Sequence, residues 1–188
     1  MKKSRTNMLV KKDNELVRNT MTQFDYKQNQ IMAVLLGKYV HEKDNKCIDS
    51  TLTVSEFLNI LEIDSIGGFN YVMIKNAIDG LAKNNTVGVM TGTKEKPVWE
   101  WRPFFSSIKF DTSTKIITFK WNDEMKPDLI NLKNKYTAYL ASDYLKLNTL
   151  YSQNLFEQMK SFQNIPKKPQ VTFTLENLYR IFQVDITK

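Results

Sequence analysis

Two residues of the sequence, His41 and Cys47, have side chains of the kinds that perform nucleophilic catalysis or bind transition metals. They are the only histidine and the only cysteine of the chain, and they lie six positions apart. A nucleophile–base pair needs a third group to orient the base, and a structural zinc site needs four ligands. The sequence offers neither, so we expect a structural or surface role for both residues.

Phosphate chemistry has no better support in the sequence. Gly67 and Gly68 are not followed by the Lys-Ser/Thr pair that completes a phosphate-binding loop. Asp123 and Glu124 stand at a predicted helix start, where capping and the helix dipole account for acidic residues. We therefore predict that the protein is not an enzyme and that it binds no cofactor and no metal.

The composition favours an acidic partner. The chain carries 27 Lys and Arg against 20 Asp and Glu, a formal net charge of +7, and such a charge favours nucleic acid as a partner. Its longest apolar run, residues 31–37, is far shorter than the roughly 18 to 20 residues that a membrane span needs. A single cysteine forms no intrachain disulfide and is typical of a reducing compartment. We predict a soluble, cytoplasmic protein with no membrane partner.

Capping signals and apolar periodicity predict the helices that would carry a binding surface. Asp25 can cap a helix over residues 26–41. Thr53 and Glu56 have the Thr-x-x-Glu spacing of a capping box, which predicts a helix over 53–63 after a short strand. The Gly pair then interrupts the helical pattern, and the next helix is predicted over roughly 69–84.

After residue 85 the hydrophobic period changes to two, which predicts strands over 86–92, 97–105, 106–112 and 115–121. The helical period returns over 122–136 and 147–163. Five aromatic residues of the strand region alternate with polar ones, and we expect most of them in the core: Trp99, Trp101, Phe104, Phe105 and Phe119. An exposed strand edge in this region would instead pair two copies of the chain.

The order of the predicted elements is helix, strand, helix, turn, helix and β-hairpin, which is the order of a winged helix. The stretch TVSEFLNILEI (53–63) has a counterpart in TLENLYRIFQV (174–184), preceded by a predicted strand over 170–173. We therefore predict an α+β fold in three parts. These are a flexible basic arm (1–12), a complete winged-helix domain (13–142) and the N-terminal part of a second winged-helix domain (143–188).

A winged helix binds DNA with one helix in the major groove and the hairpin on the backbone. In the helix 69–84, Lys75 and Lys83 are candidate phosphate ligands, and Asn76 can contact adenine with both ends of its amide. Lys94 and Lys96 are candidate contacts at a hairpin tip. A solvated helix face and an ordinary charged turn explain these residues equally well. The arm could add nonspecific attraction through Lys2, Lys3, Arg5, Lys11 and Lys12.

Four stretches resemble iteron-type plasmid replication initiators: DNELVRN (13–19), TVSEFLNILEI, FNYVMIKNAIDGLAKN (69–84) and LKNKYTAYLASDYLKL (132–147). Members of this family have two tandem winged-helix domains. The resemblance implies a double-stranded DNA partner carrying origin repeats (iterons), a homodimer through the first domain that represses its own gene, and host replication proteins as further partners. It also implies C-terminal truncation, because the chain ends before the family's second groove-binding helix.

Two other interpretations remain open at this stage. The first domain could serve as a dimerisation or interaction module of a full-length initiator. Alternatively, a small winged-helix transcription regulator would bind an operator tightly without a second domain. Binding to repeat-containing DNA over a series of salt concentrations distinguishes these functions, because an interaction module would not bind DNA even at low salt.

Overall fold

The computed structural model describes residues 8–18, 20–21, 24–41, 46–47, 49–60, 68–93, 96–130, 132, 136–163, 170–182 and 184. Their helices are α1 (Asn14–Arg18), α2 (Tyr26–Tyr39), α3 (Val54–Ile60), α4 (Gly68–Lys83), the 3-10 turn η2 (Asp123–Met125), α5 (Lys126–Leu129), α6 (Ala141–Tyr144), α7 (Leu150–Phe162) and α8 (Leu175–Phe182). Their strands are β1 (Leu9–Asp13), β2 (Thr20–Met21), β3 (Val40–His41), β4 (Lys46–Cys47), β5 (Ser50–Thr53), β6 (Thr86–Gly92), β7 (Pro97–Pro103), β8 (Phe105–Asp111), β9 (Ile116–Trp121) and β10 (Tyr136–Leu140). No helix among these residues is long and apolar enough to cross a membrane.

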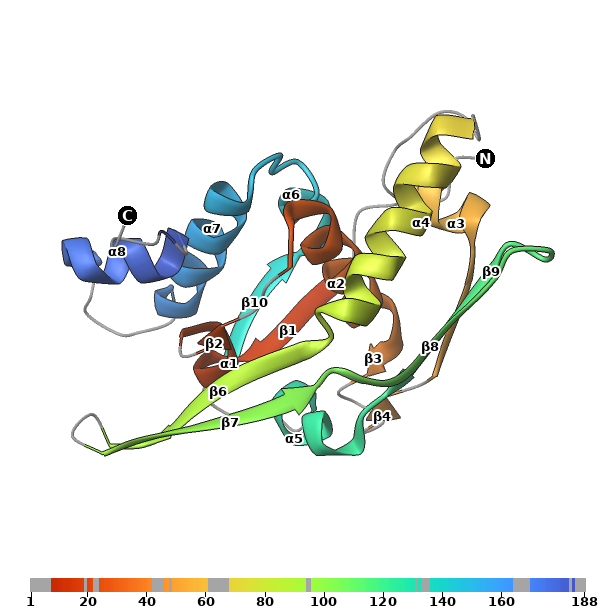
Figure 1. Cartoon of the computed structure of the whole chain (residues 1–188). Helices are drawn as coiled ribbons and strands as arrows, with labels where there is room; N and C mark the ends of the chain where they lie inside the picture. The colour runs from red at the N-terminus through yellow and green to blue at the C-terminus, as the bar shows by residue number, and fades with distance from the viewer. Residues whose placement is uncertain are drawn as a thin grey trace.

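Helix α2 lies at the centre of the fold, in contact with α4, α6 and α7 (Figure 1). Its predicted cap is confirmed, because the Asp25 carboxylate accepts a hydrogen bond of 2.8 Å from the backbone N–H of Gln28. All side chains from Gln30 to Leu36 are buried, not only those of one face. A helix that is buried on every side is typical of the interior of a domain.

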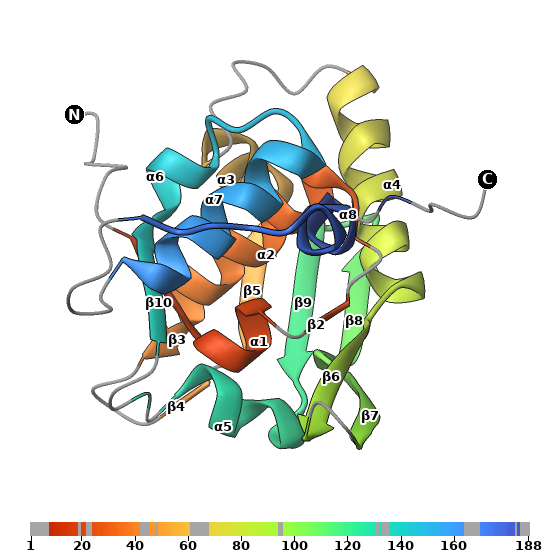
Figure 2. The same ribbon diagram turned by 90° about the vertical axis from the view of Figure 1, so that its left-hand side faces the viewer.

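The winged-helix order is confirmed by one antiparallel sheet and two helices. β5 pairs with β9, and β9 pairs with β8, so the strand that precedes α3 joins the hairpin that follows α4. The aromatic rings of Phe105, Phe119 and Trp121 pack together beneath this sheet, with centroids 4.8 to 5.2 Å apart for the contacts of Phe105. α3 and α4 lie on the side of the turn that closes the β8–β9 hairpin (Figures 1 and 2).

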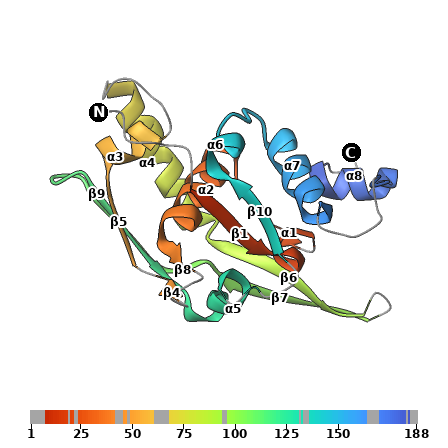
Figure 3. The same cartoon turned by 180° about the vertical axis from the view of Figure 1, so that it is seen from behind.

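A second antiparallel sheet has the order β2-β6-β7, so β7 is an edge strand in the described part of the chain. The β6–β7 and β8–β9 hairpins project in opposite directions from the body of the protein, as Figures 1 and 3 both show. The β8–β9 tip lies on the side of α3 and α4. The β6–β7 tip lies on the side of α7 and α8.

Two predictions were wrong because they missed one pairing between distant segments. The predicted loose arm includes β1, and the predicted helix over 122–136 ends at Leu129 and gives way to β10. β1 and β10 pair in antiparallel register, Leu9 opposite Leu140 and Asp13 opposite Tyr136. Thr137 and Tyr139 of β10 are buried and their neighbours are not. This two-residue alternation is that of a strand, and it replaces the helical pattern of the residues before it. The first seven residues of the arm lie outside the described residues.

The counterpart module at the end of the chain is helical, as predicted, but it lacks its strand. Residues 170–174 form no regular structure, whereas α8 follows with Thr174 as its cap. α8 packs on α7, where Ile181 is buried and the Asn154 amide donates to the Ile181 carbonyl at 2.9 Å. α7 in turn contacts α1, α2 and β10. The domain boundary at 142/143 stays a prediction.

Candidate nucleic-acid interface

The candidate interface begins with the local interactions that set α3 and α4. The predicted capping box at the start of α3 is confirmed: the Thr53 backbone N–H donates to Glu56 Oε2 (2.9 Å), and the Glu56 N–H donates to Thr53 Oγ1 (3.1 Å). The backbone hydrogen bond from Thr53 is the main reason why the pKa of Glu56 lies below its usual value. This reciprocal cap fixes where α3 begins, directly after β5.

Helix α4 buries one side and exposes the other. Ile74, Ile78 and Leu81 are buried in the core. Tyr71 packs on Phe110 of β8 with ring centroids 5.8 Å apart, which holds the first half of α4 beside the β8–β9 hairpin. The opposite side of α4 therefore faces solvent at the same end of the molecule as that hairpin.

The three candidate residues on α4 all lie on this solvent side, but they do not carry equal charge. Asn76 and Lys83 are exposed. Lys75 is also exposed, and its ammonium lies 2.8 Å from the carboxylate of Asp79 one turn later. The hydrogen bond to Asp79 raises the pKa of Lys75. The cation at Lys75 is thus largely neutralised by its neighbour, whereas that of Lys83 has no carboxylate partner among the described residues.

The hairpin beside α4 is β8–β9, and sequence reasoning missed its lysines. The Val54 backbone N–H donates to the Lys115 carbonyl at 3.0 Å, which ties the β8–β9 turn to the start of α3. Lys109, Lys115 and Lys120 are exposed or partly exposed on this hairpin, and no ion pair is seen for them within the described ranges. The two strands were predicted correctly. Their identity as the wing depends on the pairing of β5 with β9, which no local pattern reveals.

The hairpin that carries the other two candidates lies elsewhere. Lys96 belongs to the turn between β6 and β7, where its backbone N–H donates to Thr93. Lys94 lies outside the described residues. Because this tip projects away from α4 (Figures 1 and 3), the structure does not bring Lys96 together with Lys75, Asn76 and Lys83 on one surface.

The turn of the β8–β9 hairpin is built by a carboxylate. Asp111 Oδ1 accepts hydrogen bonds from the Ser113 hydroxyl (2.6 Å) and from the backbone N–H groups of Ser113 and Thr114. These bonds lower the pKa of Asp111 to about 2, the bond from the Ser113 hydroxyl contributing most. Lys115 follows with a positive φ of 56°, which reverses the chain into β9. The tip is therefore ordered by its own side chains.

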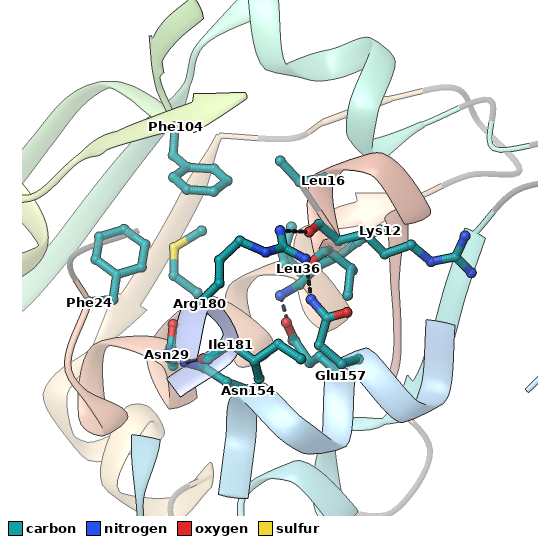
Figure 4. A pocket seen from close by; sticks show the side chains of 14 residues that line it. Lys12, Leu16, Phe24, Asn29, Leu36, Phe104, Asn154, Glu157, Arg180 and Ile181 are labelled. Carbon is teal, nitrogen blue, oxygen red and sulfur yellow. Dashed lines mark hydrogen bonds and ion pairs between the residues drawn. The ribbon is translucent and has the colours of Figure 1, made fainter. Parts of the chain in front are cut away.

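Two lysines expected in the loose arm have structural partners instead. Lys12 forms an ion pair with Glu157 of α7, and Glu157 also accepts the hydrogen bond of the Tyr139 hydroxyl. Lys11 lies over the Tyr136 ring, 4.8 Å from its centroid. The Lys12–Glu157 pair lines a small cavity of about 70 Å³ between α1, α2, α7 and α8, into which Arg180 also projects (Figure 4). The ammonium group of Lys12 therefore pairs with Glu157 inside the fold and does not serve as a free cation for DNA.

The expectation that most strand aromatics are in the core is confirmed, because three of the five are buried. Phe104, Phe105 and Phe119 are buried, whereas Trp99 and Trp101 are 40% and 58% exposed on β7. The two indoles stack on each other with centroids 6.3 Å apart. Trp101 lies across Gly88 of β6, where a Cβ atom would come within 2.8 Å of its ring. An apolar stripe thus lies on an edge strand.

His41 and Cys47 are brought close by pairing of β3 with β4, in which His41 stands opposite Lys46 and Val40 opposite Cys47. Their side chains lie outside the described residues. Among those described, no group of three or more histidine, cysteine or acidic side chains is placed to hold a metal ion.

Comparison with known proteins supports the winged-helix fold described above. Residues 9–160 match the family described as initiator replication protein, WH1. The crystal structure of the Pi initiator protein in complex with iteron DNA has a TM-score of 0.65 and 13% sequence identity, and the match covers 94% of this chain and 73% of that chain. No curated protein sequence matches the chain.

Two further solved structures are similar over part or all of the chain. They are the WH1 domain of MSBI1.176, a replication protein isolated from a multiple sclerosis patient (TM-score 0.38, 14% identity, 54% of this chain and 74% of that one), and domains 2 and 3 of RctB (TM-score 0.47, 12% identity, 96% of this chain and 72% of that one). At TM-scores below 0.5, these two matches carry no argument about the fold.

Proposed function

Because the chain belongs to the family of initiator replication proteins that carry the WH1 domain, we propose that it binds the repeats of a plasmid origin as double-stranded DNA and thereby starts replication. The observation that carries the proposal is the WH1 match over residues 9–160, together with a helix-turn-helix whose outward face and hairpin lie on one side of the molecule. The role is that of a DNA-binding protein in the cytoplasm, without catalysis, which recruits host replication proteins to the origin.

The DNA-binding surface consists of the outward face of α4 and the β8–β9 hairpin. Asn76 and Lys83 supply an amide and a cation from the helix, and Lys109 and Lys120 supply cations from the strands. Phosphate contacts from such lysines give affinity without sequence information, whereas an amide can read a base edge. Lys75 contributes less than Lys83, because its charge is paired with Asp79.

Binding measured over a series of salt concentrations tests this function. The chain should bind duplex DNA containing the origin repeats more tightly than a scrambled duplex, with log affinity falling linearly as log salt rises. Replacing Lys83, Lys109 or Lys120 by alanine should each reduce the slope by about one unit. Lys96→Ala, on the opposite hairpin, is the matched control; a reduced slope there would show that the β6–β7 tip binds DNA as well. No binding at low salt would contradict the proposal.

A second role, self-association through the first domain, is favoured by the edge strand β7. Its outer edge has no partner strand among the described residues, and the strand carries the exposed Trp99–Trp101 pair on one face. Natural proteins protect such edges, because unpaired backbone groups and apolar side chains invite pairing with another chain. We propose that two copies pair along β7, so that the dimer represses its own gene.

Sedimentation velocity tests the dimer. Trp101→Lys places a charge in the middle of the proposed contact and should convert dimers to monomers at micromolar concentration. Met159→Lys is the matched control, because Met159 on α7 is 57% exposed, close to the 58% of Trp101, and lies away from β7. Equal association of wild type and Trp101→Lys would exclude this edge. A chain that dimerises but does not bind repeat DNA at low salt would be an interaction module instead.

A further inference from the structure

The outward face of α4 is not purely polar, and its apolar residue has no structural explanation. Val72 is 53% exposed in the first half of the helix. A single exposed valine needs no explanation on most helices. Here the residue lies at the centre of the face that the proposed function directs towards DNA, one turn before Asn76 and three turns before Lys83.

The side chains around Val72 are of kinds that can contact the edges of DNA bases. Val72 and Asn76 line one shallow groove together with Asp25 and Lys27 at the start of α2, so that one acidic and one basic side chain border it. The side-chain amide of Asn76 makes no hydrogen bond to another described residue, so this amide is free to pair with a base. Asp79 lies one turn beyond Asn76 and forms an ion pair with Lys75. The apolar side chain of Val72 and the free amide of Asn76 therefore lie side by side on this face.

From this arrangement we infer that Val72 determines sequence specificity by contacting the C5-methyl group of a thymine in the major groove, two base pairs from an adenine that Asn76 reads. The inference rests on the proposed DNA-binding function and deepens it. Thymine is the base that presents a methyl group in the major groove, and asparagine pairs with the N6 and N7 edge of adenine. Residues four apart on a helix are separated by about 6 Å along its axis, close to the span of two base-pair steps of about 3.4 Å.

The position along the helix agrees with this assignment. In helix-turn-helix proteins the N-terminal residues of the recognition helix contact base edges. Val72 and Asn76 lie in the first nine residues of α4, which begins at Gly68. Lys83 is the last residue of α4. At this end of the helix its ammonium group would contact a phosphate and not a base edge. The α4 face thus divides into a base-reading half and a backbone-binding half.

Removal of single methyl groups from the DNA tests the inference. The probe is the duplex that the whole chain enriches most from a random-sequence pool, with each thymine replaced in turn by deoxyuridine. At one position, wild-type affinity should fall by about four-fold, the value of one buried methyl-sized group. Val72→Ala should lose this sensitivity. Because alanine has the higher helix propensity, the variant should fold at least as well.

Two controls make the outcome decisive. Val184→Ala also truncates an exposed valine, 43% exposed near the end of the chain, and should keep the full loss on deoxyuridine substitution. Replacing the adenine that Asn76 reads by 7-deazaadenine, which lacks N7, should weaken DNA binding by wild type and Val72→Ala equally but leave that of Asn76→Ala unaffected.

Equal sensitivity of wild type and Val72→Ala at every thymine would overturn the inference and leave the proposed function intact, provided that salt-dependent binding persists. The inference would also fail if Val72→Ala altered sedimentation and left the thymine dependence unchanged, because Val72 would then contact protein. Absence of any enriched sequence, with no binding at low salt, would overturn both the inference and the proposed function.

Discussion

The carboxylate of Asp79 lies 2.8 Å from the ammonium group of Lys75 on the outward face of α4. Both side chains are about half exposed, so the pair contributes little to folding stability. Its consequence is electrostatic: the opposite charges of the pair cancel, so Lys75 adds little net positive charge to the face that DNA would approach.

Removal of the acidic partner should therefore strengthen DNA binding. Asp79→Asn frees Lys75 and eliminates a like charge near the phosphates, so we expect affinity for duplex DNA at low salt to rise several-fold and the salt slope to steepen by about one unit. Fluorescence anisotropy over a salt series measures both. Asp143→Asn is the control, since Asp143 of α6 forms an exposed pair with Lys146, with the charged groups 3.7 Å apart. Identical behaviour of the two variants would place DNA away from α4.

The capping box of α3 should be worth a measurable part of the stability. Thr53→Ala removes the hydroxyl that accepts from the Glu56 N–H and donates to its carboxylate. We expect a loss of about 1 kcal/mol in the free energy of unfolding by urea, within the range of about 0.5–2 for cap residues. Thr112→Ala, in the exposed β8–β9 turn, should change it by less than about 0.5 kcal/mol. Similar losses in both variants would mean that the cap does not matter.

The local part of the fold could be predicted from the sequence, because local signals decide it. The Asp25 cap, the Thr53–Glu56 box and the two-residue period after residue 85 each act within a few positions. All three give elements that the structure contains. Thr174 caps α8 in the same way.

The parts that could not be predicted depend on pairing across long separations. β1 pairs with β10, which follows more than a hundred residues later in the sequence. In that position Lys12, a candidate DNA ligand in the sequence, forms an ion pair with Glu157. The choice of wing has the same origin. Both hairpins have a lysine in the turn, and only the pairing of β5 with β9 places Lys115 beside α3.

The buried Tyr139 hydroxyl makes the protein sensitive to alkali. Burial, followed by the charge of Glu157, raises the pKa of Tyr139 well above 10.0. Because the unfolded chain releases this proton near pH 10 while the folded one retains it, the stabilising contribution is complete below pH 10 and is lost as pH rises above it. In Tyr139→Phe, stability near neutral pH should fall by about 1 kcal/mol and decline less steeply above pH 10.

Thermal melts of the variants from pH 8 to pH 11 measure this difference. Tyr144 also has a raised pKa through burial, so the alkaline decline should be reduced and not abolished. The control is Tyr151→Phe, since Tyr151 is 55% exposed on α7, and its profile should follow wild type. If the pH profile of Tyr139→Phe also matches that of wild type, the Tyr139–Glu157 hydrogen bond does not contribute to folding stability.

Gly88 should be required because Trp101 lies directly on it. A methyl group at Gly88 would sit 2.8 Å from Cζ3 of the indole, closer than van der Waals contact allows, so Gly88→Ala should displace the ring and change its near-ultraviolet circular dichroism. If β7 mediates the dimer, association should weaken as well. In a Trp101→Ala background the same substitution should have no effect, since the obstacle is gone. Equal effects in both backgrounds would mean that strand β6 itself needs the glycine.

The most direct measurement of the central claim is a hydroxyl-radical footprint of the whole chain on the plasmid origin that accompanies its gene. We predict protected backbone positions that recur with the spacing of the repeats. In Lys83→Ala and in Lys109→Ala, protection should weaken at the same positions within each repeat. Protection that is uniform along the DNA, or that is unchanged in both variants, would contradict the assignment of α4 and the β8–β9 hairpin as the surface that binds the origin.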